Sequence, residues 1–262
     1  MDLGLQGKRA LVTAASGGLG YAVAEALAAE GARVALCSRD AGRAAAAAER
    51  IAASTGADVH AIEADVADPA SLEALFEAAL RALGGLDVLV NNAGGPPPGG
   101  FLDLDETQWA RGFELTLMSA VRGIRLALPS FAAAGGGRVL TIMSSSVKQA
   151  LPNLLLSNVY RPALVGLTKS LAIELGPRNV QVVGIAPGRI ATQRTDELDR
   201  AAAARAGRSF DAVRADSLAS MPAGRLGHPA EFGRVGAFLC SSAAAYVSGS
   251  VVLVDGGSTR AL

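Results

Sequence analysis

A glycine-rich turn near the amino terminus constrains this chain more than any other feature. An apolar run, Ala10-Leu11-Val12, leads into Thr13-Ala14-Ala15-Ser16-Gly17-Gly18-Leu19-Gly20, and an alanine-rich helical pattern follows from Leu19. Such a turn aims free backbone N–H groups and the positive end of a helix dipole at one point, and its glycines let a phosphate approach the backbone. The turn therefore predicts a dinucleotide site. The alternative is a turn that only lets strand and helix pack.

Strand and helix patterns alternate along the remaining chain, without a polar linker that would divide it. Half of the 262 residues are hydrophobic and only 4% are aromatic, so the core must consist of Ala, Val, Leu and Ile. This composition is typical of helices packed on a parallel sheet. We expect an α/β fold, a single-domain Rossmann-type doubly wound parallel sheet of about seven strands over residues 1–262.

The expected elements share clear boundary signals, with Gly or Pro at many of their ends. Strands are expected at 10–12, 33–38, 59–63, 87–90, 138–143, 180–186 and from 251. Helices are expected at about 19–29, 41–53, 69–83 and 107–131, and around 163–173. Residues 94–100 form a loop of Gly and Pro, and residues 193–221 form a polar stretch with helical pieces, expected to be a substrate lid.

Charge and cysteine content exclude several classes of function. The 24 basic and 24 acidic residues balance, and no basic cluster indicates nucleic acid or an anionic membrane as a partner. Cys37 and Cys240 lie in apolar runs without C-x-x-C spacing, so we expect buried thiols and no metal site. The first residues lack the features of a signal peptide, and no apolar run is long enough to span a bilayer. We expect a soluble, cytoplasmic protein.

The end of the second expected strand bears on the choice of cofactor. In dinucleotide folds this end faces the adenosine ribose, where an acid binds the 2′-hydroxyl of NAD and a basic residue accommodates the 2′-phosphate of NADP. The sequence has Ser38-Arg39 there, with no acid at position 38. Arg39 therefore favours NADP(H), and the alternative is a solvated loop arginine.

Four segments together resemble the short-chain dehydrogenase/reductase family, especially its 3-oxoacyl-acyl-carrier-protein reductases. They are the turn at 13–20, Asn91-Asn92-Ala93-Gly94, the segment from Pro187 to Thr192, and the terminal V-D-G-G at 254–257. Ala14 stands where the family usually has its first glycine. The resemblance implies the following NADP(H)-binding residues: Thr13, Ser16, Gly17, Gly18, Leu19, Gly20, Ser38, Arg39, Asp65, Val66, Asn92, Ala93, Gly94, Arg161, Pro187, Gly188, Ile190 and Thr192.

The same resemblance implies catalysis by a tyrosine, a lysine and a serine, and here the sequence departs from the family. Gly166-Leu167-Thr168-Lys169-Ser170-Leu171 is similar to the family's G-L-T-K-S-L and fixes the alignment. Ser157 then stands at the tyrosine and Arg161 at the lysine, while Ser144, thirteen residues before Ser157, matches the family serine. Thr116 replaces the helix asparagine.

These replacements change the chemistry that the site can perform. An aliphatic hydroxyl is a far weaker acid than a phenol, so Ser157 does not easily deliver a proton. Arginine keeps the positive charge on a longer, planar fork. We expect Ser144 to bind the substrate oxygen, Arg161 to supply positive charge and Tyr160 to act as the phenolic donor.

Alternatives for the proton source stay open. Lys148 is one, and water acting through Ser157 and Thr116 is another. For Tyr160 itself, a packed or partner-facing tyrosine is the other interpretation, and for Lys148 a surface lysine. Pro162 suggests a helix that starts near Asn158, since proline fits only the first turn without a kink.

Two hypotheses of function follow. The first is an oxidoreductase that transfers a hydride between NADP(H) and a small carbonyl or alcohol substrate with a rearranged proton donor. The second is a catalytically silent NADP(H)-binding subunit or sensor. The helices at 107–131 and 163–175 are apolar on nearly every face, so we also expect a homodimer or homotetramer, with the tetramer favoured.

Overall fold

A computed structural model describes residues 2–261, which form one seven-stranded sheet in the order β3-β2-β1-β4-β5-β6-β7. All neighbouring strands run parallel. The strands are β1 Arg9–Val12, β2 Arg33–Ser38, β3 Val59–Glu63, β4 Val88–Asn91, β5 Gly137–Ile142, β6 Val180–Pro187 and β7 Val251–Val254. The predicted fold class is confirmed.

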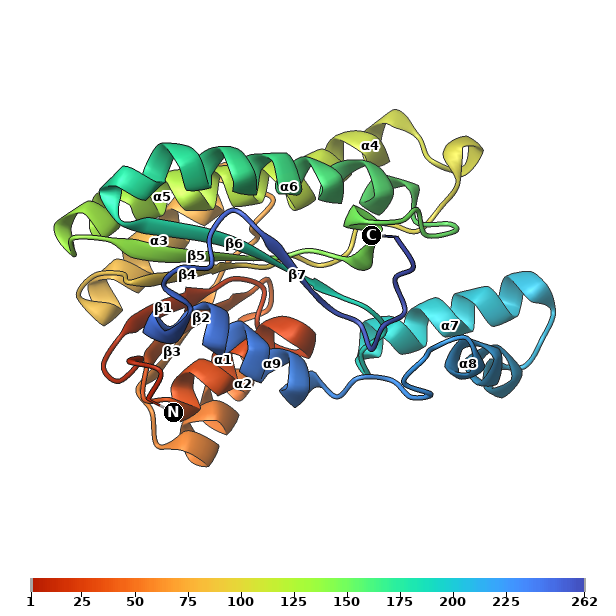
Figure 1. The fold of residues 1–262 in the computed structure, drawn as a ribbon, viewed down its shortest axis with the longest axis horizontal. Coiled ribbons are helices and arrows are strands. Elements are labelled where there is room, and N and C mark those ends of the chain that lie inside the picture. Colours follow the sequence, from red (N-terminus) through yellow and green to blue (C-terminus); the bar gives the residue numbers. More distant parts are fainter. Residues whose placement is uncertain (1, 262) are drawn as a thin grey trace.

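Helices cover both faces of this sheet (Figure 1). They are α1 Gly18–Ala29, α2 Ala41–Thr55, α3 Pro69–Leu83, α4 Glu106–Phe113, α5 Ser119–Ala133, α6 Leu155–Leu175, α7 Gln193–Ala206, α8 Phe210–Ala219 and α9 Pro229–Leu239. Helices α1, α2 and α9 pack on one face, and α3, α5 and α6 pack on the other. None of the helices within residues 2–261 is long and apolar enough to cross a membrane.

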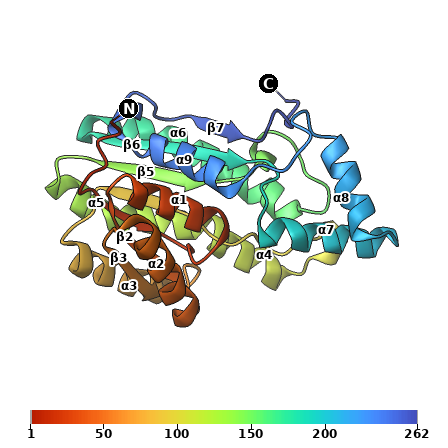
Figure 2. The same ribbon diagram turned by 90° about the horizontal axis from the view of Figure 1, so that it is seen from below.

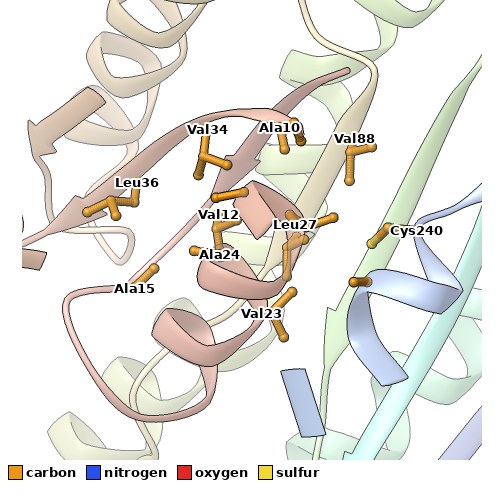
Figure 3. Packing of buried hydrophobic residues seen from close by; sticks show 14 of the residues in the cluster. Ala10, Val12, Ala15, Val23, Ala24, Leu27, Val34, Leu36, Val88 and Cys240 are labelled. Atoms are coloured by element: carbon orange, nitrogen blue, oxygen red, sulfur yellow. The ribbon is translucent and has the colours of Figure 1, made fainter. Parts of the chain in front are cut away.

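Alternate side chains of each strand enter the two cores, as the pleat of a strand requires. On β1, Val12 packs with α1 and α2, whereas Leu11 packs with α3 and α5. Figure 3 shows the first core, where Leu27 of α1 lies over β1 and β4. Cys37 and Cys240 are both buried free thiols, as expected.

The strand order reverses between β1 and β4, and this reversal places the site. From β1 the chain moves outward to β2 and β3, then returns to β4 on the other side of β1. In such sheets the crevice outside the carboxyl ends of the two central strands is where ligands bind. The turn after β1 and the Asn92-Ala93-Gly94 segment after β4 both open onto this crevice.

The long helix expected over 107–131 contains an irregularity. Helix α4 passes into a π-helix over Glu114–Met118, and α5 continues from Ser119. Thr116 lies in this π-helical turn and is buried. Such turns often occur at functional sites.

The expectation that a helix starts near Asn158 is wrong. Helix α6 starts at Leu155, and Pro162 lies inside it. The Asn158 side chain explains the earlier start, because it accepts from the N–H of Leu151 at 3.0 Å and donates to the carbonyl of Leu151 at 2.9 Å. This clamp fixes the chain ahead of the helix. Ser157 and Arg161 therefore lie one turn apart on α6.

The segment predicted to be a lid contains α7 and α8, which project from one end of the molecule beyond the carboxyl end of β6 (Figures 1 and 2). Its centre is Asp199, which is only 2% exposed. The Asp199 carboxylate pairs with Arg189 and, at 2.5 Å, with Arg214. A buried carboxylate with two cations holds the two lid helices to the segment that follows β6.

Candidate active site

The glycine-rich turn is joined directly to the segment that follows β4. Thr13 Oγ1 donates to the carbonyl of Asn92 at 2.6 Å, and the Asn92 amide N–H returns a bond to Thr13 Oγ1 at 2.8 Å. Asn92 Nδ2 also donates to the carbonyl of Ala14 at 2.9 Å. A Cβ at Gly20 would lie 2.5 Å from Asn92 Nδ2, so only glycine fits there. The structure thus brings the predicted cofactor segments together.

The amino terminus of α1 is suited to a phosphate. Gly17 is the N-cap and provides no side chain to bond the first N–H groups, and the first turn has no acidic residue. These donors and the helix dipole are available to an anion. The lid begins close by, since a Cβ at Gly18 would lie 3.9 Å from Thr192 Cγ2. A dinucleotide pyrophosphate therefore fits this turn.

Ala14, at the family's usual glycine, has a left-handed backbone with φ of 47°. Its N–H donates to Cys37 Sγ at 3.2 Å, and the N–H of Ala15 donates to the carbonyl of Cys37 at 2.8 Å. Burial raises the pKa of Cys37 to about 11, so the thiol stays protonated and acts as an acceptor. These bonds keep the turn in place against β2.

At the adenosine end, Arg39 is exposed and forms no ion pair with any residue from 2 to 261. The neighbouring carboxylate of Asp40 faces its own helix, where it caps α2 by accepting from the N–H of Arg43 at 2.9 Å. Asp65 accepts from the N–H of Ala67 at 3.0 Å, so its carboxylate holds a turn, and Val66 beside it is buried. Arg39 is thus an exposed cation at the carboxyl end of β2 without a carboxylate partner within residues 2–261.

The segment from Pro187 to Thr192 runs along the carboxyl end of β6. Gly188 packs so closely on Asp255 that a Cβ would lie 2.6 Å from the Asp255 Cβ. Ile190 forms an isolated bridge with Gly227, and Thr192 is the N-cap of α7.

Ser146 contacts both of the serines predicted to be catalytic, one through its backbone N–H and the other through its hydroxyl. Ser144 caps the 3-10 helix Ser145–Val147, and its Oγ accepts from the N–H of Ser146 at 3.1 Å. Ser146 Oγ and Ser157 Oγ are 3.0 Å apart, and both side chains are buried. Ser146 was not predicted, although the Ser144-Ser145-Ser146 triplet was a visible signal. Ser144 and Ser157 are thus linked through Ser146.

Arg161 is a buried cation, only 7% exposed. One terminal nitrogen, Nη1, donates to the carbonyl of Ile142 at the end of β5 at 2.6 Å, while Nε has no hydrogen-bond partner within residues 2–261. Burial, with the nearby charge of Arg194, lowers the pKa of Arg161 to about 10. The guanidinium therefore remains charged at neutral pH.

Tyr160 contacts helix α4, and no hydrogen bond joins it to the serines within residues 2–261. Its hydroxyl donates to the carbonyl of Trp109 at 3.0 Å. The ring packs edge-on against Trp109 and also against Phe113, with centroid distances of 5.9 Å in both pairs. The physical reason is the close approach of α4, where Gly112 leaves room for the Tyr160 ring. Burial raises the pKa of the phenol, which further disfavours phenolate.

A small cavity lies beneath the site, between the carboxyl ends of the central strands and helices α5 and α6. Its volume is about 10 Å³, which matches one water molecule. Its lining includes Thr116, Asn91 and Arg161, and all three carry a buried polar atom without a partner within residues 2–261: Thr116 Oγ1, Asn91 Nδ2 and Arg161 Nε. These orphaned groups provide the polar partners that a buried water needs.

Lys148 is exposed and follows the 3-10 helix that Ser144 caps. It lies four residues beyond Ser144 on the chain leaving β5.

Comparison with known proteins decides the family. The family model described as Enoyl-(Acyl carrier protein) reductase matches residues 13–259. The chain belongs to the short-chain dehydrogenase/reductase family. It is 35% identical to the 3-oxoacyl-(acyl-carrier-protein) reductase of Aquifex aeolicus, over 98% of this chain and 99% of that protein. The 7α-hydroxysteroid dehydrogenase of Escherichia coli K12 is 33% identical, over 100% of this chain and 98% of the relative.

The structure of another short-chain reductase superposes over the whole molecule. L-sorbose reductase from Gluconobacter frateurii, complexed with NADPH and L-sorbose, has a TM-score of 0.94 and 33% identity, with 100% of both chains covered. By its family, the chain is thus a short-chain oxidoreductase, and its structural neighbour was solved with a nicotinamide dinucleotide bound.

Proposed function

We propose that this protein is an NADP(H)-dependent reductase of small carbonyl compounds that works without the family's tyrosine and lysine. The observation that supports this most is the contact of Ser146 with both Ser144 and Ser157, with the charged Arg161 bonded to the end of β5 close by in the chain. It lies beside a turn suited to a dinucleotide. Relatives that reduce 3-oxoacyl groups, a hydroxysteroid dehydrogenase and a sugar reductase support a carbonyl or alcohol substrate.

The cofactor would lie across the strand reversal. The α1 amino terminus and Thr192 would hold its pyrophosphate, Arg39 its 2′-phosphate, and Asp65 and Val66 its adenine. Asn92, Ala93, Gly94 and Arg161 would hold the nicotinamide ribose, and Pro187, Gly188 and Ile190 would border the nicotinamide. When bound, the nicotinamide supplies or accepts the hydride.

Ser144 would bind the substrate oxygen, on which negative charge develops during reduction. A hydroxyl donor and the nearby Arg161 cation stabilise that charge in a site of low polarity. Ser157 would pass on a proton that comes from water. A cavity that matches one water molecule lies against Arg161, one turn further along α6, and against the unpaired Thr116 hydroxyl. This replaces Tyr160 as the source, because its hydroxyl is engaged by Trp109.

Steady-state kinetics with NADPH and a panel of ketones, aldehydes and oxo acids tests the proposal. Ser144→Ala should lower kcat by about 10²–10³-fold, as removal of one oxyanion donor does, with an unchanged Kd for NADPH. Ser157→Ala should lower kcat as well. Tyr160→Phe is the matched control and should keep kcat, because its hydroxyl bonds only the Trp109 carbonyl among residues 2–261.

Two results would change the assignment. If Tyr160→Phe abolishes turnover, the phenol must leave Trp109 during the reaction and is the donor. If Lys148→Ala abolishes turnover and Ser157→Ala does not, the lysine carries the proton.

The second candidate function is a silent NADP(H)-binding subunit or sensor. The observation that favours it is the hydrogen bond of the Tyr160 hydroxyl, which goes to the Trp109 carbonyl and to neither Ser144 nor Ser157. Tight NADPH binding without oxidation by any member of the panel would establish it in place of the reductase.

A further inference from the structure

Arg194 reaches from the lid to the loop that follows the β4 segment. Its Nη2 donates to the carbonyl of Pro96 at 3.0 Å. Its guanidinium lies against Gly95, where a Cβ would be 3.1 Å from Nη2. Arg194 therefore places a positive charge where α7 meets the loop after Asn92-Ala93-Gly94, at the edge of the crevice.

Two arginines near Arg194, Arg189 and Arg214, pair closely with carboxylates, whereas Arg194 has only a distant and exposed carboxylate partner. Asp199 pairs with both Arg189 and Arg214, and Asp196 accepts from Arg214 Nη2 at 2.6 Å. For Arg194, the nearest carboxylate in residues 2–261 is Glu197, 4.0 Å from Nη1. An exposed pair at that distance contributes little. Arg194 thus keeps its charge for another partner.

Arg161 adds a second positive charge within electrostatic range. It is buried and has no carboxylate partner among the residues the structure describes, and Arg194 is close enough to disfavour its charged form. A buried cation is costly unless an opposite charge pairs with it. A buried guanidinium without a carboxylate partner within residues 2–261, and a second one whose carboxylate partner is distant and exposed, form a site that an anion would stabilise.

We propose that Arg194 binds the carboxylate of the substrate, in the positive field of Arg161, so that the protein acts on oxo acids and the matching hydroxy acids. This inference rests on the proposed function, since the carbonyl of the same molecule would be bound by Ser144. The planar guanidinium fork matches a carboxylate with two parallel hydrogen bonds. Its present acceptor, a neutral carbonyl on Pro96, is weaker and can be exchanged.

The phosphates of the cofactor share this anionic chemistry, so the experiment must separate the two sources. The wild type, Arg194→Met and Arg200→Met are compared with 2-oxopentanoate, 4-oxopentanoate and 5-oxohexanoate and with their methyl esters. Arg200 is an exposed arginine on the same helix and serves as the matched control. Kd for NADPH is measured for each variant, and pentanoate, which has no ketone to reduce, is titrated into the NADPH complex by cofactor fluorescence.

For at least one acid, we expect the wild type to show a KM about 10- to 100-fold lower than for its ester, the range of one charge-assisted hydrogen bond. Arg194→Met should abolish this preference for acids and weaken the binding of pentanoate by a similar factor, with the Kd for NADPH unchanged. Arg200→Met should keep both the preference for acids and the affinity for pentanoate.

Equal KM values for acids and esters in the wild type would overturn the inference. An Arg194→Met variant that keeps the preference for acids but binds NADPH tenfold more weakly would also overturn it, and would assign Arg194 to the cofactor phosphates. Absence of turnover with every ketone would refute the proposed reductase, whereas pentanoate binding would still test Arg194.

Discussion

Ala14 stands where the family usually has glycine, and it adopts the left-handed backbone that favours glycine. A left-handed backbone is unfavourable for alanine by roughly 1–2 kcal/mol. The turn tolerates it because the N–H groups of Ala14 and Ala15 are both bonded to Cys37, and the Ala14 carbonyl accepts from Asn92. Three separate segments therefore impose one conformation on this residue.

Ala14→Gly should leave the fold intact and raise its stability slightly. Relief of the left-handed strain outweighs the greater freedom of glycine in the unfolded chain, roughly 0.5–1 kcal/mol, so we expect a net gain of about 0–1 kcal/mol. Thermal unfolding should show an increase in Tm of up to about 3 °C. Ala15→Gly is the control and should lower Tm, because Ala15 is buried and has no such strain to relieve. A lower Tm for Ala14→Gly would contradict this account.

Arg39 is the residue on which the preference for NADP depends. Arg39→Ala should raise the Kd for NADPH about tenfold, the effect of losing one charge-assisted hydrogen bond at an exposed position. The Kd for NADH should not change, which makes NADH the internal control. Isothermal titration calorimetry measures both. Equal affinities of the wild type for NADPH and NADH would disprove the assignment.

The ends of helices and strands could be predicted from the sequence where a neighbouring proline or glycine marks them. Pro69 begins α3 and Gly84 ends it, and the expected bounds of β3 are those observed. The start of α6 was not predictable in this way, because it depends on the contact between Asn158 and Leu151 across the preceding loop. The π-helical turn at Thr116 likewise has no sequence period of its own.

In the candidate site too, some residues could be assigned from the sequence, whereas the positions of others depend on contacts with distant elements. Ser144, Ser157 and Arg161 were assigned from the resemblance to the family, because the segment Gly166–Leu171 fixes the alignment and the family's residue spacings do the rest. The direction of Tyr160 could not be assigned in this way, because it is determined by Trp109 and Gly112 on another helix. Arg194 gave no signal, since its role depends on where the lid folds back onto Pro96.

At the amino ends of the central strands, on the side of the sheet away from the candidate site, one ion pair joins the start of β1 to the residue before β4. Arg9 Nε donates to Asp87 Oδ2 at 2.8 Å and Nη2 to Oδ1 at 2.9 Å, while the Arg9 N–H also bonds Oδ2. Burial alone would raise the pKa of Asp87, but the hydrogen bonds from Arg9 outweigh it and lower the pKa below its usual 3.8. Asp87 therefore stabilises the fold when it is ionised.

Asp87→Asn should lower the free energy of unfolding at pH 7 by about 1–3 kcal/mol. Because the folded pKa of Asp87 is depressed, its contribution is complete above about pH 4 and is lost as the pH falls through the lowered value. The difference in the free energy of unfolding between wild type and variant should thus be smaller at pH 3 than at pH 7. Urea unfolding at both pH values measures it, with Glu63→Gln as an exposed control. A gap that stays constant down to pH 2 would contradict the assignment.

On the scale of the whole molecule, helix α6 leaves an apolar outer face uncovered. Val159 is 44% exposed and Ile173 is 73% exposed, and their spacing of fourteen residues puts them on the same side of the helix. Phe113, at the end of α4, is also partly exposed. Such faces are typical of contacts between subunits.

We therefore predict a homodimer or homotetramer that uses this face. Ile173→Arg should shift the assembly towards smaller species, because a charge would be buried in the interface. Multi-angle light scattering at micromolar concentration measures the mass. Glu49→Ala, an exposed change on α2 at the other face of the sheet, should leave the mass unchanged. A wild-type monomer under these conditions would refute the prediction.

The contact between Cys37 and the turn has a practical consequence. The thiol is fully buried, and its pKa near 11 leaves only a trace of reactive thiolate at neutral pH. A thiol reagent can therefore reach Cys37 only when the turn at Ala14 lifts from β2. In a Cys240→Ser background, the rate at which the reagent labels Cys37 measures how often the turn opens. If added nucleotide binds the turn, this labelling rate should fall, so nucleotide binding can be detected without any turnover.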